Sequence, residues 1–242
     1  MNTSIYKRKI SNFLSYNPIS KKIKQQIDNT NDDDDDDDDD DDKHNIAHLL
    51  VNNNNVFIEN NHIYFKTDVN KESVNCLIKL MNKYIDDFIL LQKDNSCFDI
   101  KPKPLFIHIT SNGGYIQYGF IAYDYIKLLL KKFPIYTIIE GNAFSMASII
   151  SMAGLKRFIL PSSYMLLHQL SSGFKGKYDD IQDECAYLDD LMKKIIEIYI
   201  LESKEKMTKT FIKNLLKQEQ MLDAKKCIKY GLVDEIYTGQ TE

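Results

Sequence analysis

The sequence lacks the cysteine pattern and the long apolar runs that mark metal-binding, secreted or membrane proteins. Its four cysteines, Cys76, Cys97, Cys185 and Cys227, include no pair at the spacing of a zinc or redox motif. We therefore expect no disulfide, no metal, no cofactor and a cytoplasmic or otherwise reducing location. No apolar run approaches the roughly 18 residues of a membrane-spanning helix, and no signal peptide is expected because the N-terminus has no apolar stretch.

Positive charge is not gathered into a basic stripe either. The formal net charge of −4 includes a run of 11 aspartates at 32–42, so the rest of the chain carries +7. Because this charge is spread out and not interleaved with aromatic residues, we expect no nucleic-acid partner. Residues 1–27 contain six Lys/Arg and no acid, which fits either a disordered basic arm or an organellar transit segment. A mitochondrial or other organelle matrix is therefore the alternative location.

The chain divides near residue 56. Adjacent like charges repel one another and cannot pack, so residues 1–55 are predicted to be a disordered low-complexity tail. Over 56–238, short apolar runs alternate with apolar positions spaced by three and four, which predicts an α/β domain with a largely parallel sheet. We expect strands within 56–65, 105–109, 135–139, 157–160, 164–167 and 233–237, helices along 74–88, 121–129, 145–154, 181–199, 208–216 and 223–230, and a polar loop at 93–103.

Ser145, in the stretch EGNAFSMAS, is a candidate nucleophile. It follows a buried strand that is expected to end at Gly141, and it stands at the start of a predicted helix. Such a turn holds the hydroxyl away from the sheet and next to free N–H groups. On position alone, the simpler interpretation is that Ser145 only caps the helix.

Two other predicted strand ends carry residues that fit the same chemistry. His168 follows the strand at 164–167 and could act as a general base at neutral pH, or be a structural histidine. Gly113 and Gly114 follow the strand at 105–109, where paired glycines allow a carbonyl group to approach a backbone N–H, or form a plain turn. Because ligands of parallel α/β folds bind at this edge of the sheet, the coincidence favours one site.

Three segments, SNGG at 111–114, GNAFSMAS at 141–148 and MLLHQ at 165–169, strongly resemble motifs of the proteolytic subunits of the Clp protease, the ClpP family. That family has an S-P-G-G-type turn, then a G-x-A-x-S-M-[GA] stretch, and an M-I-H-Q-type stretch some two dozen residues later. Here the serine and the histidine are 23 residues apart, and Asn112 replaces the proline of the turn.

The end of the chain extends this resemblance. The family closes with an A-x-x-A-x-x-Y-G-L-[IV]-D pattern, which AKKCIKYGLVDEI matches with Cys227 at the second alanine. The likeness covers 56–238 and implies a ClpP/crotonase-like repeated β-β-α core with a long handle helix near 178–203. It also implies homo-oligomeric stacked rings that cleave polypeptides in a closed chamber and are fed by an ATPase unfoldase. The N-terminal tail is unlike the family.

The resemblance implies a role for each matching residue. Ser145 would attack the scissile carbonyl, and His168 would take its proton and return it to the leaving amine. The N–H groups of Gly113 and Met146 would stabilise the oxyanion. Since the base must be neutral, activity should fall below about pH 6.5.

The third member of the triad departs from the family. Counting back from the closing pattern places Glu219 where the family has an aspartate, and Asp223 is a second candidate. A glutamate keeps the carboxylate, but its extra methylene shifts the charge by more than about 1 Å unless the backbone adjusts. Glu219 could also be a solvated surface acid.

Three functions therefore stand open. The first is a ClpP-type serine endopeptidase, and the second is a catalytically weak or inactive ring subunit with a structural or regulatory role, because of the altered acid. The third is a crotonase-type enzyme acting on acyl-CoA, which would not need the Ser–His pair that is present here.

Overall fold

A computed structural model describes residues 55–94 and 101–239 of the chain. The predicted tail, residues 1–55, lies outside the described residues apart from Asn55, and so does much of the predicted polar loop at 93–103. From Val56 onward, strands and helices alternate as the sequence predicts.

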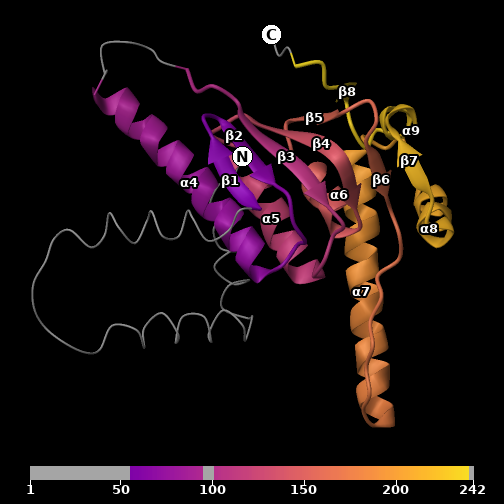
Figure 1. The fold of residues 1–242 in the computed structure, drawn as a ribbon. Helices are drawn as coiled ribbons and strands as arrows, with labels where there is room; N and C mark the ends of the chain where they lie inside the picture. Colours follow the sequence, from indigo (N-terminus) through magenta and orange to yellow (C-terminus); the bar gives the residue numbers. More distant parts are fainter. Residues whose placement is uncertain (1–54, 95–100, 240–242) are drawn as a thin grey trace, which may run out of the picture. The chain divides into compact units, whose positions relative to one another are not determined.

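Eight strands of the described chain form one sheet (Figure 1). They are β1 (Val56–Glu59), β2 (His62–Phe65), β3 (Leu105–Ser111), β4 (Ile135–Phe144), β5 (Lys156–Ile159), β6 (Tyr164–Leu166), β7 (Met221–Asp223) and β8 (Glu235–Ile236). The order β1-β2-β3-β4-β5-β8 is parallel except for β1 at the edge. β6 lies parallel to the end of β4, and β7 lies antiparallel to β6. The predicted α/β fold with a largely parallel sheet is therefore confirmed.

The main core forms between one face of this sheet and the helices α4 (Lys71–Asp94), α5 (Ile116–Leu129) and α6 (Met146–Ser151), and buried residues of the C-terminal helices join it. Side chains alternate between the two faces of a strand. In β3, Ile107 and Ile109 point into the main core, whereas Phe106 points to the opposite face, where it packs with Ile138 and Phe158. α4 begins with a reciprocal cap, because Ser73 N–H donates to Asn70 Oδ1 at 2.9 Å and Asn70 N–H donates to Ser73 Oγ at 3.0 Å.

Strand β4 is longer than the sequence predicts. It was expected to end at Gly141, but it continues to Phe144 and changes partners on the way. Its first half pairs with β5, and Asn142–Phe144 pair with β6. Gly141 takes a φ of 76°, and the register between β3 and β4 shifts beside it. Since glycine adopts positive φ at little cost, Gly141 bends the strand and does not end it.

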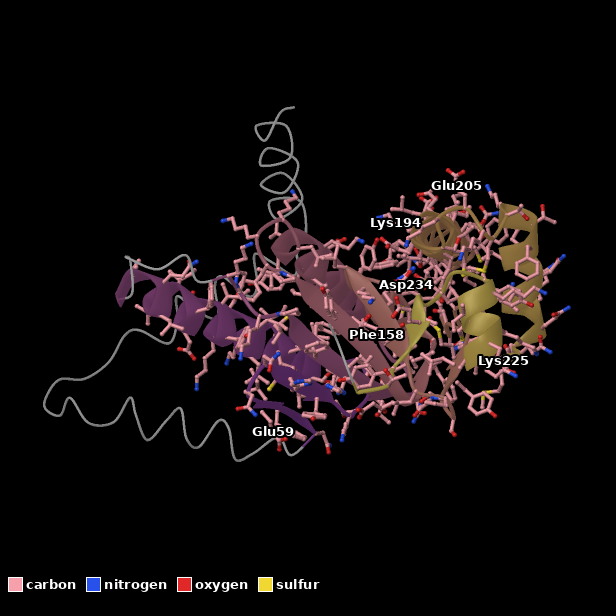
Figure 2. All side chains as sticks on the ribbon, turned by 90° about the horizontal axis from the view of Figure 1, so that it is seen from above. Glu59, Phe158, Lys194, Glu205, Lys225 and Asp234 are labelled. Atoms are coloured by element: carbon pink, nitrogen blue, oxygen red, sulfur yellow. The ribbon has the colours of Figure 1, made fainter. Side chains whose placement is uncertain are left out.

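Arg157, in β5, ties the sheet to the C-terminal part of the chain. It is only 3% exposed, and its guanidinium donates to both Asp234 carboxylate oxygens, at 2.7 and 3.0 Å, and to the carbonyls of Glu202 and Gly231. Burial opposes ionisation of Asp234, but the bonds and charge of Arg157 and of Lys204 outweigh it and lower the Asp234 pKa to about 2. Asp234 is labelled in Figure 2, near Phe158 of β5.

The expected handle helix is α7 (Tyr178–Glu202). Its buried residues begin only at Leu191, and Tyr178, Ile181 and Tyr187 in its first half are exposed apolar side chains. α8 (Lys209–Gln218) packs against α7, and α9 (Ala224–Lys229) packs against β6 and β7. None of the helices in the described residues is long and apolar enough to cross a membrane.

Candidate active site

The glycine turn after β3 is fixed by a segment from the start of the domain. Val69, which is fully buried, donates its N–H to the Gly113 carbonyl at 2.7 Å and accepts from the N–H of Tyr115 at 2.8 Å. A Cβ added at Gly114 would collide with the Val69 carbonyl oxygen. Asn112, which replaces the proline of the resembled motif, accepts a hydrogen bond from Asn142 Nδ2 of β4 at 2.9 Å. The turn is therefore held in place on both sides.

Ser145 has the backbone of a nucleophile at a sharp strand-to-helix turn. Its φ of 52° and ψ of −126° are rare for a residue with a Cβ. It precedes α6, but its side chain makes no capping hydrogen bond to the helix. Its backbone N–H donates to Leu166 O at 2.8 Å, which ties the turn to β6. The side chain of Ser145 therefore does not cap the helix, although its position alone favours that role.

The structure brings Gly113, Ser145 and Met146 together. The pairing of Ser111 with Ala143, continued by two residues along both strands, sets Gly113 beside Ser145. A Cβ added at Gly113 would lie 2.6 Å from Ser145 Cβ and 3.1 Å from the Met146 nitrogen. Only a glycine fits against the nucleophile here, also because the φ of Gly113 is 98°.

Two N–H groups at this place have no acceptor among the described residues. The N–H of Met146 is the first of α6 and has no partner within the helix. In the glycine turn, Gly113 N–H donates to Ser111 Oγ at 3.1 Å, whereas no acceptor within the described chain takes the Gly114 N–H. The predicted oxyanion donor Gly113 is thus engaged by Ser111, and Gly114 offers the unpaired N–H of the turn.

His168 follows β6, two residues after Leu166, whose carbonyl binds the Ser145 N–H. Its ring is half-buried, and its Nδ1 lies 2.6 Å from the carbonyl oxygen of Gln169. A carbonyl only accepts hydrogen bonds, so Nδ1 carries the proton and Nε2 keeps its lone pair in the neutral ring. This tautomer is the one that a general base facing a serine requires.

Glu219 is positioned by β7, a strand that the sequence did not predict. β7 pairs antiparallel with β6, with Leu166 opposite Met221. His168 and Glu219 each lie two residues beyond this last pair, so both are at the same end of β6 and β7. Glu219 ends α8 in a left-handed conformation, with φ 48° and ψ 42°, and its side chain is exposed.

The second acid candidate, Asp223, has another role. Its carboxylate caps α9 by accepting from Lys226 N–H at 2.8 Å, and it lies opposite Tyr164, four residues before His168. The sheet therefore aligns Gly113, Ser145, His168 and Glu219 on four neighbouring strand ends, those of β3, β4, β6 and β7. In the described part of the chain, no side-chain hydrogen bond joins Ser145, His168 and Glu219 to one another.

Comparison with known proteins decides the family. The sequence profile described as Clp protease matches residues 49–240. The chain is also 32% identical, over 185 residues, to the ATP-dependent Clp protease proteolytic subunit 2 of Treponema denticola. That alignment covers 74% of this chain and 83% of the relative. The chain belongs to the Clp protease family. The resemblance stated from the SNGG, GNAFSMAS and MLLHQ segments is thereby confirmed.

Within residues 55–94 and 101–239, no three His, Cys, Asp or Glu side chains are grouped so that they could hold a metal ion. Cys76, Cys185 and Cys227 are free thiols. Burial raises the pKa of Cys227 to about 12, so its thiol stays protonated and serves as a core side chain.

Two other histidines lie on the sheet face opposite the main core. His62 Nδ1 lies 2.8 Å from His108 Nε2, and His108 Nδ1 lies 2.6 Å from Glu140 Oε1. Burial lowers the pKa of His108, although Glu140 opposes this, and burial together with the His108 charge lowers the pKa of His62. His108 is 4% exposed, as expected for a histidine inside a strand.

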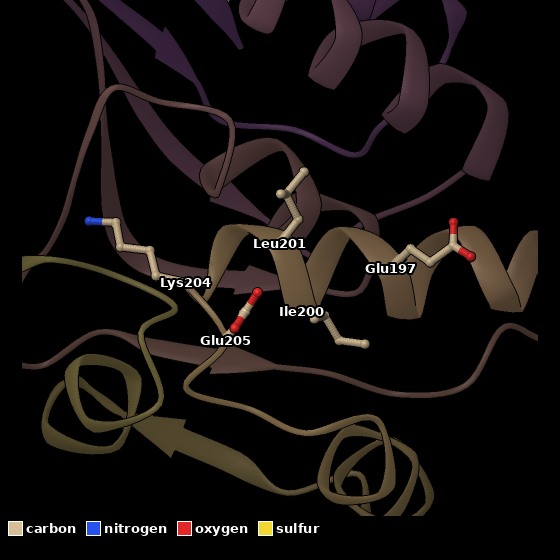
Figure 3. A pocket seen from close by; sticks show the side chains of 5 residues that line it. All are labelled: Glu197, Ile200, Leu201, Lys204 and Glu205. Atoms are coloured by element: carbon tan, nitrogen blue, oxygen red, sulfur yellow. The ribbon is translucent and has the colours of Figure 1, made fainter.

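Two surface hollows flank the C-terminal half of α7. One, of about 400 Å³, lies at the end of the helix and is lined by Glu197, Ile200, Leu201, Lys204 and Glu205 (Figure 3). None of the predicted site residues line it. The other, of about 410 Å³, includes Gln169, the neighbour of His168, and is taken up below.

Proposed function

We propose that this chain is a serine endopeptidase that hydrolyses peptide bonds of unfolded polypeptides inside an oligomeric ring chamber. The observation that carries the proposal is the strained backbone of Ser145, whose hydroxyl caps nothing although it stands at a helix start. Membership of the Clp protease family supports a peptidase. This family membership does not support the alternative of a crotonase-type enzyme acting on acyl-CoA.

The arrangement supports a complete acyl-transfer cycle. Ser145 Oγ attacks the scissile carbonyl carbon while His168 Nε2 takes the hydroxyl proton. The C–N bond then breaks as His168 returns that proton to the leaving amine, and water hydrolyses the acyl-enzyme by the same route. The N–H of Met146 and an N–H of the glycine turn, from Gly113 or Gly114, donate to the oxyanion. Loss of one such donor costs about 10²–10³ in rate.

We assign to Glu219 the role of holding the imidazolium that forms on His168. The pairing of β6 with β7 supports this assignment, because each of the two residues lies two positions beyond the last pair, Leu166 and Met221. The Nδ1–H of His168 is bonded to the Gln169 carbonyl at 2.6 Å. The carboxylate must therefore replace this carbonyl, or share the proton with it, when the triad acts.

Assembly into stacked homo-oligomeric rings is part of the proposal. The first half of α7 has no buried residue and exposes Tyr178, Ile181 and Tyr187, as a helix that contacts a second copy of the chain would. The relative from Treponema denticola is named an ATP-dependent proteolytic subunit. That name supports an ATPase unfoldase as the partner that delivers substrate.

Hydrolysis of a short fluorogenic peptide by the full chain tests the proposal. Ser145→Ala should lower kcat/KM by at least about 10³-fold. The matched control is Ser162→Ala, because Ser162 is an exposed serine in the turn before β6 and should retain full activity. Undiminished hydrolysis by Ser145→Ala would overturn the proposal.

A catalytically weak ring subunit is the second candidate, and the exposed Glu219 favours it. If the longer side chain cannot reach His168, then Glu219→Asp should raise kcat/KM by tenfold or more. If Glu219 already works, the same substitution should leave kcat/KM unchanged or lower it. Native mass measured alongside would show whether Glu219→Asp changes the oligomeric state.

A further inference from the structure

A groove rich in lysine runs beside the candidate active site. It lies between α7 and α8, has a volume of about 410 Å³ and includes Gln169 in its lining. Gln169 is next to His168, and Lys217, which also lines the groove, is two residues from Glu219. Its other lining residues are Asp189, Met192, Lys193, Ile196, Lys209, Lys213 and Leu216. The groove therefore adjoins, along the chain, the residues proposed to act with Ser145.

Three of the lining lysines share one side of α8. Lys209, Lys213 and Lys217 follow one another at intervals of four residues, which places them in a row along the helix. No carboxylate in the described chain pairs with any of the three. Each is exposed, so the row presents three uncompensated positive charges to the groove.

The remaining charges do not cancel this row. Lys193 pairs with Asp190 at 2.7 Å, so that cation is already compensated. Asp189 is the one carboxylate that lines the groove, and Glu219 beyond its end is assigned to His168. The groove is therefore left with an excess of positive charge.

Below the charges the groove is apolar. Ile196 is 4% exposed and Leu216 is 1% exposed, and Met192 packs beside them. An apolar floor with a cationic rim suits an extended peptide that places an apolar side chain inward and acidic side chains on the rim. The hollow at the end of α7 differs, because Glu197 and Glu205 outnumber Lys204 there.

We infer that this groove selects peptide substrates with acidic residues next to the scissile bond, and that Lys213 and Lys217 determine this specificity. The inference rests on the proposed peptidase function and names the substrate class of the same site. Attraction between the lysine row and a carboxylate is screened within about 8 Å at physiological salt. The preference should therefore act through KM and weaken as salt is added.

Two fluorogenic peptides with the same residue before the scissile bond, one flanked by glutamates and one by glutamines, provide the kinetic test. In the wild-type chain the acidic peptide should have the lower KM. Lys213→Glu with Lys217→Glu should raise that KM about tenfold, leave kcat within about twofold and leave the glutamine peptide unaffected. The neutral pair Lys213→Gln with Lys217→Gln should give an intermediate KM.

Lys225→Glu is the matched control, because Lys225 is an exposed lysine on α9 that does not line the groove (Figure 2). It should change neither KM. Raising the salt from 50 to 300 mM (roughly a 2.5-fold shorter screening length) should raise the KM of the acidic peptide in the wild type only. Equal KM values for the two peptides in the wild type, or equal losses for both in the variant, would overturn the inference.

A binding measurement keeps this test separate from the test of peptidase function. Fluorescence anisotropy of the labelled peptides on Ser145→Ala requires no hydrolysis. Tighter binding of the acidic peptide, weakened about tenfold by Lys213→Glu with Lys217→Glu, supports the groove even if no peptide is cleaved. Equal affinity for both peptides overturns the inference even if the wild-type chain proves to be an active peptidase.

Discussion

The two halves of the candidate site are held by different kinds of contact. On the nucleophile side, backbone hydrogen bonds fix Ser145 and the glycine turn. Gly113 also lies so close to Ser145 that a residue with a Cβ would not fit there. On the acid–base side, His168 and Glu219 lie at the same end of the paired strands β6 and β7, but no side-chain bond joins them within the described residues. One half is built by the backbone, and the other depends on side-chain rotamers.

This difference indicates which half of the site tolerates substitutions. In the backbone half, main-chain hydrogen bonds fix the position of Ser145, and this position does not depend on the rotamers of neighbouring side chains. We propose that the side-chain half accepts a glutamate in place of an aspartate through a different rotamer of the longer side chain. The predictions that follow test how far each half is needed.

Glu219→Gln should have the largest effect. It keeps the size of the side chain but removes the charge that stabilises the imidazolium, so kcat should fall by up to about 10⁴-fold. Steady-state hydrolysis of a fluorogenic peptide measures this. A loss of less than about tenfold would contradict the role assigned to Glu219. It would mean that the Gln169 carbonyl alone orients His168.

Gly113→Ala should lower kcat by about 10²–10³-fold, because displacing the glycine turn removes its oxyanion donor from the place beside Ser145. The added Cβ would lie 2.6 Å from Ser145 Cβ at a φ of 98°, so the turn must move away from the nucleophile. The matched control is Gly173→Ala, because a Cβ there meets nothing within 4 Å and activity should be retained. Full activity of Gly113→Ala would contradict a rigid nucleophile half.

Asp234→Asn should lower the free energy of unfolding without changing the candidate active site. The Asp234 pKa is lowered to about 2 from 3.8, so the ionised carboxylate stabilises the fold above pH 3.8, and this contribution is lost as the pH falls toward 2. Its loss should cost about 2 kcal/mol at neutral pH. Urea denaturation at pH 7 and pH 3 measures this. The variant should be less stable at pH 7 and should differ less from the wild type at pH 3.

His108→Asn should have the smallest effect and a different pH window. The pKa values of His62 and His108 are lowered in the fold from 6.5, so the unfolded chain binds protons first and stability falls as the pH drops below 6.5. The asparagine keeps a donor toward Glu140 but does not titrate. Urea midpoints between pH 5 and 7.5 should vary less in the variant than in the wild type. An unchanged pH dependence would show that this pair does not cause the acid instability.

Much of the fold and of the nucleophile half could be predicted from the sequence. Apolar runs and spacings of three and four predicted most strands and helices. Ser145, His168 and Gly113 stood out because each follows a strand at one edge of the sheet. The SNGG, GNAFSMAS and MLLHQ segments then pointed to the Clp protease family, which the comparisons confirm.

What the sequence could not provide depends on pairing between distant segments. β7 has only three residues and no alternating pattern, so nothing local marks the strand that brings Glu219 to the same end of the sheet as His168. The sequence predicts an end of β4 at Gly141 because a glycine follows the apolar run, whereas in the fold this glycine bends the strand, which continues to Phe144. The lysine row on α8 was visible as spacing, but its closeness to Gln169 arises only in the fold.

The most direct test of the central claim is labelling of the full chain with a fluorophosphonate, followed by mapping of the modified peptide by mass spectrometry. The strained, uncapped Ser145 beside His168 should carry the adduct. Ser145→Ala should abolish labelling, and His168→Ala should slow it by at least about 10²-fold. No adduct on Ser145, or equal labelling after His168→Ala, would contradict the account of Ser145 as a nucleophile activated by this histidine.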